Sequence, residues 1–132
     1  MSAVKYNEAE EAFELEYKLW GNSAKVLFYV ETEQQIMDDL SAISETLDRI
    51  DRNREKIAGI ILREKVRHPH PEIKSFAESL SIDCAYVEPE DGEIYVRFIV
   101  SDAGCCLSDR LELEYSAENG VEVIGWYGQV MS

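Results

Sequence analysis

The chain has 132 residues, 45% hydrophobic and 30% charged, and its 27 acidic and 13 basic residues give a net charge of -14. This length and apolar content predict one folded domain over residues 1-132 and argue against a disordered acidic tail. No apolar run approaches the ~20 residues that cross a membrane, and the five glutamates among the first 20 residues are foreign to a signal peptide. The charge also disfavours nucleic acid and anionic membranes as partners. We therefore expect a cytoplasmic protein.

The negative charge is unevenly distributed along the chain. Residues 1-48 carry three basic and eleven acidic side chains, and residues 75-132 carry two basic and twelve acidic ones. Residues 49-74, between them, carry eight basic and four acidic side chains. This pattern fits either charge pairing within the molecule or an acidic surface that binds a basic partner.

The three cysteines are typical of a protein from a reducing compartment. Their number is odd, Cys105 and Cys106 are adjacent, and no C-x-x-C pair is present. These spacings leave out the usual zinc and thioredoxin motifs. Buried, unreactive thiols are expected, because the acidic surroundings disfavour a thiolate.

An N-terminal β-hairpin is the first predicted element. Apolar and charged side chains alternate over residues 13-20, and the Gly-Asn pair at residues 21-22 is a turn signal before a second strand over residues 24-31. A turn at that pair sets Leu19 opposite Ala24 and places the apolar side chains of both strands on one face.

The other face of this hairpin carries two noteworthy features. The same register sets Lys18 opposite Lys25, a like-charge contact. Trp20, at the end of the first strand, also falls on this second face by alternation.

An amphipathic helical segment follows the hairpin. Thr32 and Gln35 have the spacing of a capping box. Behind them an apolar stripe recurs at helical spacing, formed by Ile36, Leu40, Ile43, Leu47, Ile50, Ile57 and Ile61. The stripe is interrupted at residues 51-53, so the helix is either continuous from about 33 to 66 or broken at that point.

The predicted helical segment ends at Pro69 and Pro71, and a short helix with an apolar side follows over residues 73-80. Residues 82-88 and 93-101 then form a hairpin around a Pro-Glu-Asp-Gly turn.

A last hairpin is predicted around Asn119-Gly120, a strong turn signal between residues 109-116 and 121-127. A two-residue turn there sets Leu113 opposite Trp126 on the core face. The order of elements predicts an α+β fold. We expect an antiparallel sheet of about six strands, an N-terminal hairpin plus a C-terminal meander, with the central helical segment packed on it.

Strand alternation gathers tyrosines and glutamates on the face turned away from the predicted core. Tyr86 and Tyr95 fall on this face, as does Val123. The candidate binding residues on it are Tyr29, Glu14, Glu16, Glu112, Glu114 and Tyr127. Amphipathic rings amid carboxylates are typical of a protein-binding surface. Alternatively, helices cover this face and the tyrosines are simply packed.

Few residues suggest an enzyme. His68 and His70 could face one metal ion from an extended chain, but no third ligand has a local spacing, so no metal site is assigned. Acidic residues cluster at 88-93 without a calcium-loop pattern. The sequence has no phosphate loop, nucleophile elbow or dinucleotide fingerprint, so no cofactor is expected. A small carboxylate- or metal-dependent hydrolase stays an alternative.

Several segments resemble a family of small acidic bacterial domains of unknown function. The likeness lies in Leu19-Trp20-Gly21, in the helical start near Thr32, and in residues 76-82 and 119-125. Some members are similar to immunity proteins of bacterial toxin systems, so the resemblance implies binding and blocking of a toxin. Ser108-Asp109 stands where such families often have Gly-His, so a role of that histidine is not inherited.

These observations predict a non-enzymatic domain that binds a protein, and specifically a basic one, through an acidic, tyrosine-bearing sheet face. The third alternative is a structural accessory protein that forms homo-oligomers through a sheet edge or the long helix.

Overall fold

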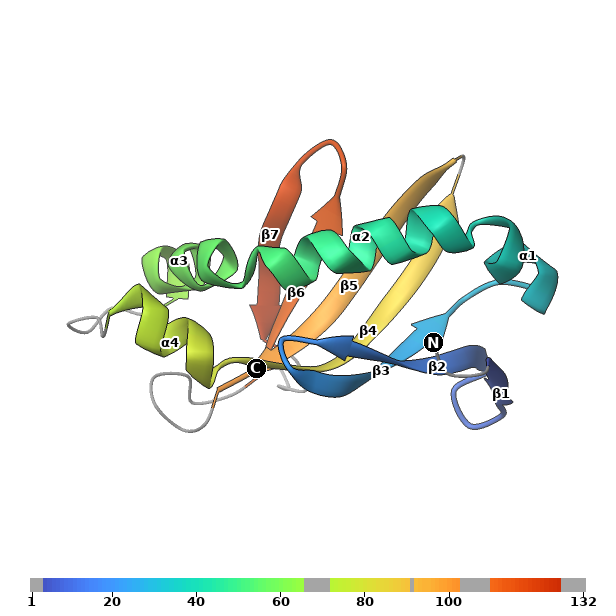
Figure 1. Ribbon diagram of the computed structural model, residues 1–132, viewed down its shortest axis with the longest axis horizontal. Helices are drawn as coiled ribbons and strands as arrows, with labels where there is room; N and C mark the ends of the chain where they lie inside the picture. Colours follow the sequence, from blue (N-terminus) through green and yellow to red (C-terminus); the bar gives the residue numbers. More distant parts are fainter. Residues whose placement is uncertain (1–3, 66–71, 91, 103–109, 127–132) are drawn as a thin grey trace.

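The computed structural model describes residues 4-65, 72-90, 92-102 and 110-126. These ranges hold four helices and seven strands in an α+β arrangement, with the helices along one face of the sheet (Figure 1). The helices are α1 (Glu33–Asp38), α2 (Leu40–Arg52), α3 (Arg54–Lys65) and α4 (Ile73–Ser79). The strands are β1 (Lys5–Asn7), β2 (Ala12–Leu19), β3 (Asn22–Phe28), β4 (Ser81–Glu90), β5 (Glu93–Ser101), β6 (Leu111–Ser116) and β7 (Gly120–Trp126).

The seven strands lie in chain order across one sheet. Five neighbouring pairs are antiparallel, but β3 and β4 are parallel, which corrects the expected all-antiparallel sheet. The four helices connect β3 to β4, and such a long connection returns the chain to the same end of the sheet before β4 begins. The strand missing from the prediction is β1, whose three residues are too few to alternate.

The N-terminal hairpin has its predicted apolar face but a different register. Trp20 and Gly21 form the turn with φ angles of 52° and 82°, and Leu19 pairs with Asn22 instead of Ala24. Positive φ at both turn residues matches the twist of the flanking strands. The shift is by two residues and keeps every side chain on its predicted face.

The same shift removes the like-charge contact expected on the other face. Lys18 lies opposite Ser23, and Lys25 lies opposite Glu16. Opposite charges at a cross-strand position stabilise the pairing, so the observed register is electrostatically better than the predicted one.

Trp20 is buried among the core residues, which corrects its expected place on the other face. The left-handed backbone at this residue interrupts the alternation of the strand, and the side chain is 4% exposed. Its Nε1–H donates to the Ile50 carbonyl oxygen at 3.0 Å, and its backbone N–H donates to Asp51 Oδ1 at 2.6 Å. The ring packs edge-on against Phe98, and the Arg54 guanidinium lies 5.8 Å from its centroid.

The central helical segment is broken twice. The capping box of Thr32 and Gln35 is present and opens α1. Asp39 separates α1 from α2, and Asn53 separates α2 from α3. The second break falls where the apolar stripe is interrupted, so the broken alternative is the correct one. Leu40 is half-buried, and the rest of the predicted stripe is fully buried.

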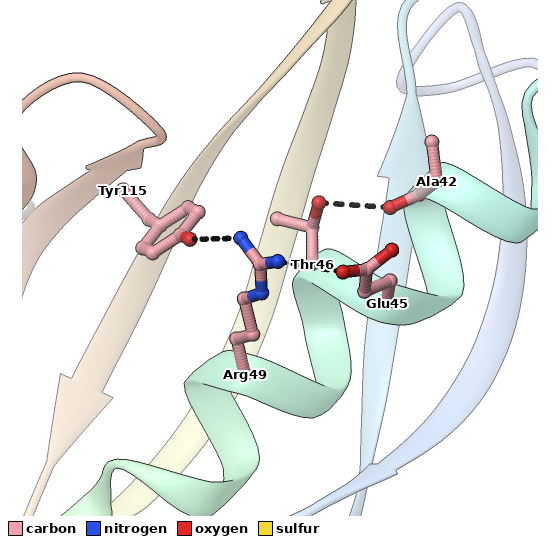
Figure 2. Close-up of polar contacts among 5 residues, drawn as sticks. All are labelled: Ala42, Glu45, Thr46, Arg49 and Tyr115. Atoms are coloured by element: carbon pink, nitrogen blue, oxygen red, sulfur yellow. Dashed lines mark hydrogen bonds and ion pairs between the residues drawn. The ribbon is translucent and has the colours of Figure 1, made fainter.

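Arg49 connects α2 to the sheet on the helix-covered side. Figure 2 shows its guanidinium between the Tyr115 hydroxyl, 3.4 Å from Nη1, and the Glu45 carboxylate, 2.6 Å from Nη2. The same view shows Thr46 donating a hydrogen bond to the Ala42 carbonyl oxygen one turn back. The Tyr115 contact, with Glu45 beside it, raises the pKa of Arg49. Part of the basic middle segment is therefore paired within the molecule.

The β6–β7 hairpin also has a register other than the predicted one. Leu113 pairs with Val123 instead of Trp126. The loop is one residue longer than expected, and the Asn119 backbone N–H donates to Ser116 Oγ at 3.1 Å within it. The partner of Leu113 is three residues away from the predicted one. Because this is an odd number, Val123 packs against the core instead of pointing away from it. A bulge shifts the register once more toward the end of β7.

The core lies between the helices and the sheet. Its central side chains are fully buried, among them Phe28, Ile43, Leu47, Ile57, Phe76, Val96 and Phe98. No helix in the described part of the chain is long and apolar enough to cross a membrane. Some predicted features lie outside the described residues, namely His68, Pro69, His70, Pro71, Cys105, Cys106, Asp109 and Tyr127.

Candidate protein-binding surface

The face of the sheet turned away from the helices is called the outer face here. Neighbouring side chains form a row on it that crosses all seven strands: Lys5, Glu14, Leu27, Tyr86, Arg97, Glu114 and Glu122. A second row runs beside the first: Glu16, Lys25, Cys84, Ile99 and Glu112. None of the four described helices lies on this face (Figure 1). Four of the predicted binding residues, all glutamates, therefore lie in these two rows.

The C-terminal half of the sheet is the acidic half. Strands β4 to β7 contain seven acidic residues and a single basic one, Arg97. Its Nη1 lies 4.0 Å from Glu112 Oε2, and 46% of the Arg97 side chain is accessible. Arg97 also neighbours Glu114 across the β5–β6 pair. One basic residue thus has two acidic neighbours on β6, and this part of the face keeps a net negative charge.

Two tyrosines stack on the outer face. The ring centroids of Tyr29 and Tyr86 are 5.9 Å apart and their planes are inclined by 11°. Tyr29 follows the last residue of β3, and its backbone N–H donates to the Val87 carbonyl oxygen at 3.2 Å, which continues the pairing with β4. Cys84 Sγ donates to the Tyr86 hydroxyl at 3.5 Å. Tyr29 is 42% exposed, so one large ring lies at the surface on a firmly positioned backbone.

A small pocket opens beside the stacked rings. Its volume is about 210 Å³, and we call it the tyrosine pocket, lined by Glu10, Tyr29, Tyr86, Arg97 and Glu112. These residues come from the β1–β2 loop, the end of β3, and strands β4, β5 and β6. The lining combines two aromatic rings with two carboxylates and one guanidinium. It can hold a group that is both flat and polar.

The predicted binding residues are not equivalent in the structure. Tyr29 and Glu112 line the tyrosine pocket, and Glu114 lies beside Arg97. Glu14 is only 9% exposed, and its carboxylate accepts a hydrogen bond from Asn7 Nδ2 at 2.6 Å. Glu14 therefore holds β1 against β2. Glu16, in contrast, is exposed on the hairpin.

The pocket also contains residues that the candidate set lacked. Tyr86 and Arg97 alternate with buried neighbours in β4 and β5, so strand parity alone could have added both. Glu10 follows β1, the strand that the sequence did not predict. No sequence signal links this loop residue to strands more than 70 residues further along the chain.

Tyr95 extends the acidic character of the outer face toward the strand ends. Its hydroxyl donates to Glu93 Oε2 at 2.6 Å. This hydrogen bond and the negative charge of Glu93, with smaller effects from Glu90 and Glu118, raise the pKa of Tyr95 to about 12. The phenol thus reports a negative potential at this end of β4–β7.

Among the described residues, two further hollows lie on the helix-covered side. One, of about 690 Å³, lies between α3 and α4 and is largely apolar, with Gly59, Ile60 and Ile73 in its lining. The other, of about 660 Å³, runs along α1 and α2 past Asp38, Glu45 and Asp48. Neither contains a predicted binding residue. Within the described ranges, no three His, Cys, Asp or Glu side chains gather closely enough to hold a metal ion.

The chain was also compared with known proteins. No protein-family model, curated protein or solved structure matches it.

Proposed function

We propose that this protein is a non-enzymatic domain that binds a basic protein partner on the outer face of its sheet. The observation that carries the proposal is the stacked pair of Tyr29 and Tyr86 on a carboxylate-bearing face that no described helix covers. Partly exposed tyrosines contribute large contact area at a low cost in side-chain entropy. The ring of Tyr29 is the natural anchor of such an interface.

Charge complementarity favours a basic partner over a neutral one. The seven acids of β4 to β7 outnumber their one base, and the chain as a whole has a net charge of -14. A potential of this kind attracts a cationic protein and raises its association rate at low salt. Hydrogen bonds between the partner and Glu112 or Glu114 would then contribute specificity.

Some members of the family that the sequence resembles are similar to immunity proteins, which implies a biological role for this binding. An immunity protein neutralises its toxin by binding it, and a basic toxin surface would complement the acidic outer face. In this version of the proposal, the acidic outer face is the inhibitory surface, and the partner is a basic toxin encoded by the adjacent gene.

The test measures binding of the purified product of the adjacent gene at 50 and 300 mM NaCl. The double variant Glu112→Gln with Glu114→Gln removes two carboxylates from the outer face. Its matched control, Glu33→Gln with Glu78→Gln, changes the net charge equally at exposed positions on the helices. We expect the outer-face variant to lose about tenfold in affinity, mainly through slower association, and the control to lose less than about twofold.

Two results would contradict the proposal. Equal losses in both double variants would mean that only net charge matters and that the outer face is not the docking surface. No binding to the adjacent gene product at either salt concentration would contradict the immunity-type role.

A further inference from the structure

The tyrosine pocket has a lining that suits one particular kind of cation. Tyr29 and Tyr86 supply aromatic surface, and Glu10 and Glu112 supply two carboxylates. Arg97 is the basic residue in this lining, and it lies at the Glu112 end, 4.0 Å from that carboxylate. The lining therefore has a net charge of about -1 at neutral pH, by the ordinary ionisation of these side chains.

We propose that the tyrosine pocket receives an arginine side chain of the basic partner. The guanidinium lies against the exposed ring of Tyr29, and its charge faces Glu10, since Arg97 already lies beside Glu112. This inference rests on the proposed function, since it names the partner group that enters the outer face. It adds a chemical preference, arginine over lysine, that charge complementarity alone does not imply.

The preference follows from the shape of the two cations. A guanidinium is planar, stacks on aromatic rings, and presents a fork of donors that matches a carboxylate. An ammonium is a compact, strongly hydrated charge that makes poorer use of a flat aromatic wall. The 42% exposed ring of Tyr29 and the carboxylates of the pocket together match the first description.

Arg97 has a positioning role in this arrangement. The contact with Glu112 holds the guanidinium of Arg97 at the pocket wall, next to Tyr86 on the neighbouring strand. Because Arg97 lies at the Glu112 end, Glu10 at the loop end has the carboxylate best placed to meet a second cation. The incoming arginine therefore enters between Tyr29 and Glu10.

The test compares two synthetic peptides of equal length and charge, Gly-Ser chains bearing four arginines or four lysines, by titration calorimetry at 50 mM NaCl. We expect the wild-type protein to prefer the arginine peptide by about three- to fivefold, the size of an exposed cation–π contact. Tyr29→Leu should remove the preference, and Glu10→Gln should weaken binding of the arginine peptide. Tyr6→Leu is the matched control, because Tyr6 is a 53% exposed tyrosine outside the pocket.

The possible outcomes separate this inference from the proposed function. Equal affinity for the two peptides overturns the arginine pocket, and so does a preference that survives Tyr29→Leu or disappears equally in Tyr6→Leu. If both peptides bind equally and the Glu112→Gln/Glu114→Gln variant still weakens them, the acidic docking face stands and only the arginine preference fails. Binding of neither peptide overturns the inference as well.

Discussion

The two faces of the sheet differ in what their side chains contact. On the helix-covered face, Phe28, Val96 and Phe98 are 0% exposed and pack against helical residues in one continuous core. On the outer face, charged and aromatic side chains occupy the corresponding alternate positions, with Tyr29 42% exposed. The same strands thus carry both surfaces, because successive residues point to opposite sides.

This difference separates stability from recognition within a single sheet. Removing apolar surface from water is the main favourable contribution to folding, and that burial is concentrated on the helix-covered face. The outer face contributes partly exposed charge, which adds little to stability but much to the rate and specificity of association. Leu27 and Ile99 are exceptions, since they are buried outer-face residues of the central strands.

The largest expected effect is on the helix-covered face. Phe98→Ala should destabilise the protein by about 3–5 kcal/mol, because it removes a fully buried ring and leaves a cavity against Trp20. Urea unfolding followed by circular dichroism measures the change. The outer-face counterpart, Tyr29→Ala, should cost less than about 1 kcal/mol. Similar losses in the two variants would contradict the division between the faces.

A smaller effect is expected where the first hairpin turn meets the helix break. Trp20→Phe removes the indole N–H that donates to the Ile50 carbonyl oxygen, which keeps its second hydrogen bond, from the Asn53 backbone N–H. The net loss of one such hydrogen bond costs about 0.5–1.5 kcal/mol. The measurement is again urea unfolding, with Tyr6→Phe as an exposed control expected to change stability by less than about 0.5 kcal/mol. A loss no larger than the control's would mean that the turn is held by packing alone.

Features that depend on side-chain periodicity within one strand or one helix could be predicted from the sequence. The apolar face of the first hairpin and the capping box at Thr32 follow from local patterns, and the interrupted stripe marked where a break near Asn53 could fall without excluding a continuous helix. The strand register was harder to predict, because moving the turn by one residue changes the cross-strand partners without changing which side chains share a face. The actual turn at Trp20-Gly21 needs a left-handed tryptophan, which the tertiary contacts of its indole stabilise.

The candidate surface was predictable to the same extent. Parity put Glu112 and Glu114 on the outer face, but the pocket depends on which strands are neighbours. The parallel pairing of β3 with β4 brings Tyr29 onto Tyr86, and neither residue's own strand encodes that pairing. Glu10 depends on a three-residue strand that has no periodic signal.

The outer face should tolerate charge removal with little change in stability. Glu112→Gln with Glu114→Gln should shift the free energy of unfolding by no more than about 0.5 kcal/mol. Glu114 lies opposite Glu122, so loss of its charge relieves a like-charge pair and offsets the weakened contact between Arg97 and Glu112. Thermal unfolding at low salt tests this, with the wild type alongside. A loss above about 2 kcal/mol would assign these carboxylates a structural role.

The smallest expected effect is a change in the titration of two tyrosines, one on each face. The pKa values of both are raised to about 12. For Tyr17, on the helix-covered face, burial is the main cause and the hydrogen bond to Asp48 adds to it. For Tyr95, on the outer face, the hydrogen bond to the Glu93 carboxylate is the main cause, and the negative charge of Glu93 adds to it. A raised pKa means that the folded state holds the proton more tightly. The resulting stabilisation is therefore complete below about pH 10 and is lost as the pH rises through about 12.

Salt should separate the two phenols, because it screens exposed charges far more than it changes burial. Absorbance at 295 nm is followed from pH 8 to 12.5. At low salt, some tyrosines should ionise only near pH 12, and Tyr95→Phe should have one fewer of these than the wild type. In 1 M NaCl the Tyr95 pKa should fall partway toward its ordinary value, because salt screens the Glu93 charge and leaves the hydrogen bond, while the pKa of Tyr17 should change less. Tyr17→Phe identifies the phenol that remains. Equal lowering of both pKa values by salt would mean that Tyr17 is as accessible to solvent ions as Tyr95. The two faces would then not differ in desolvation at these tyrosines.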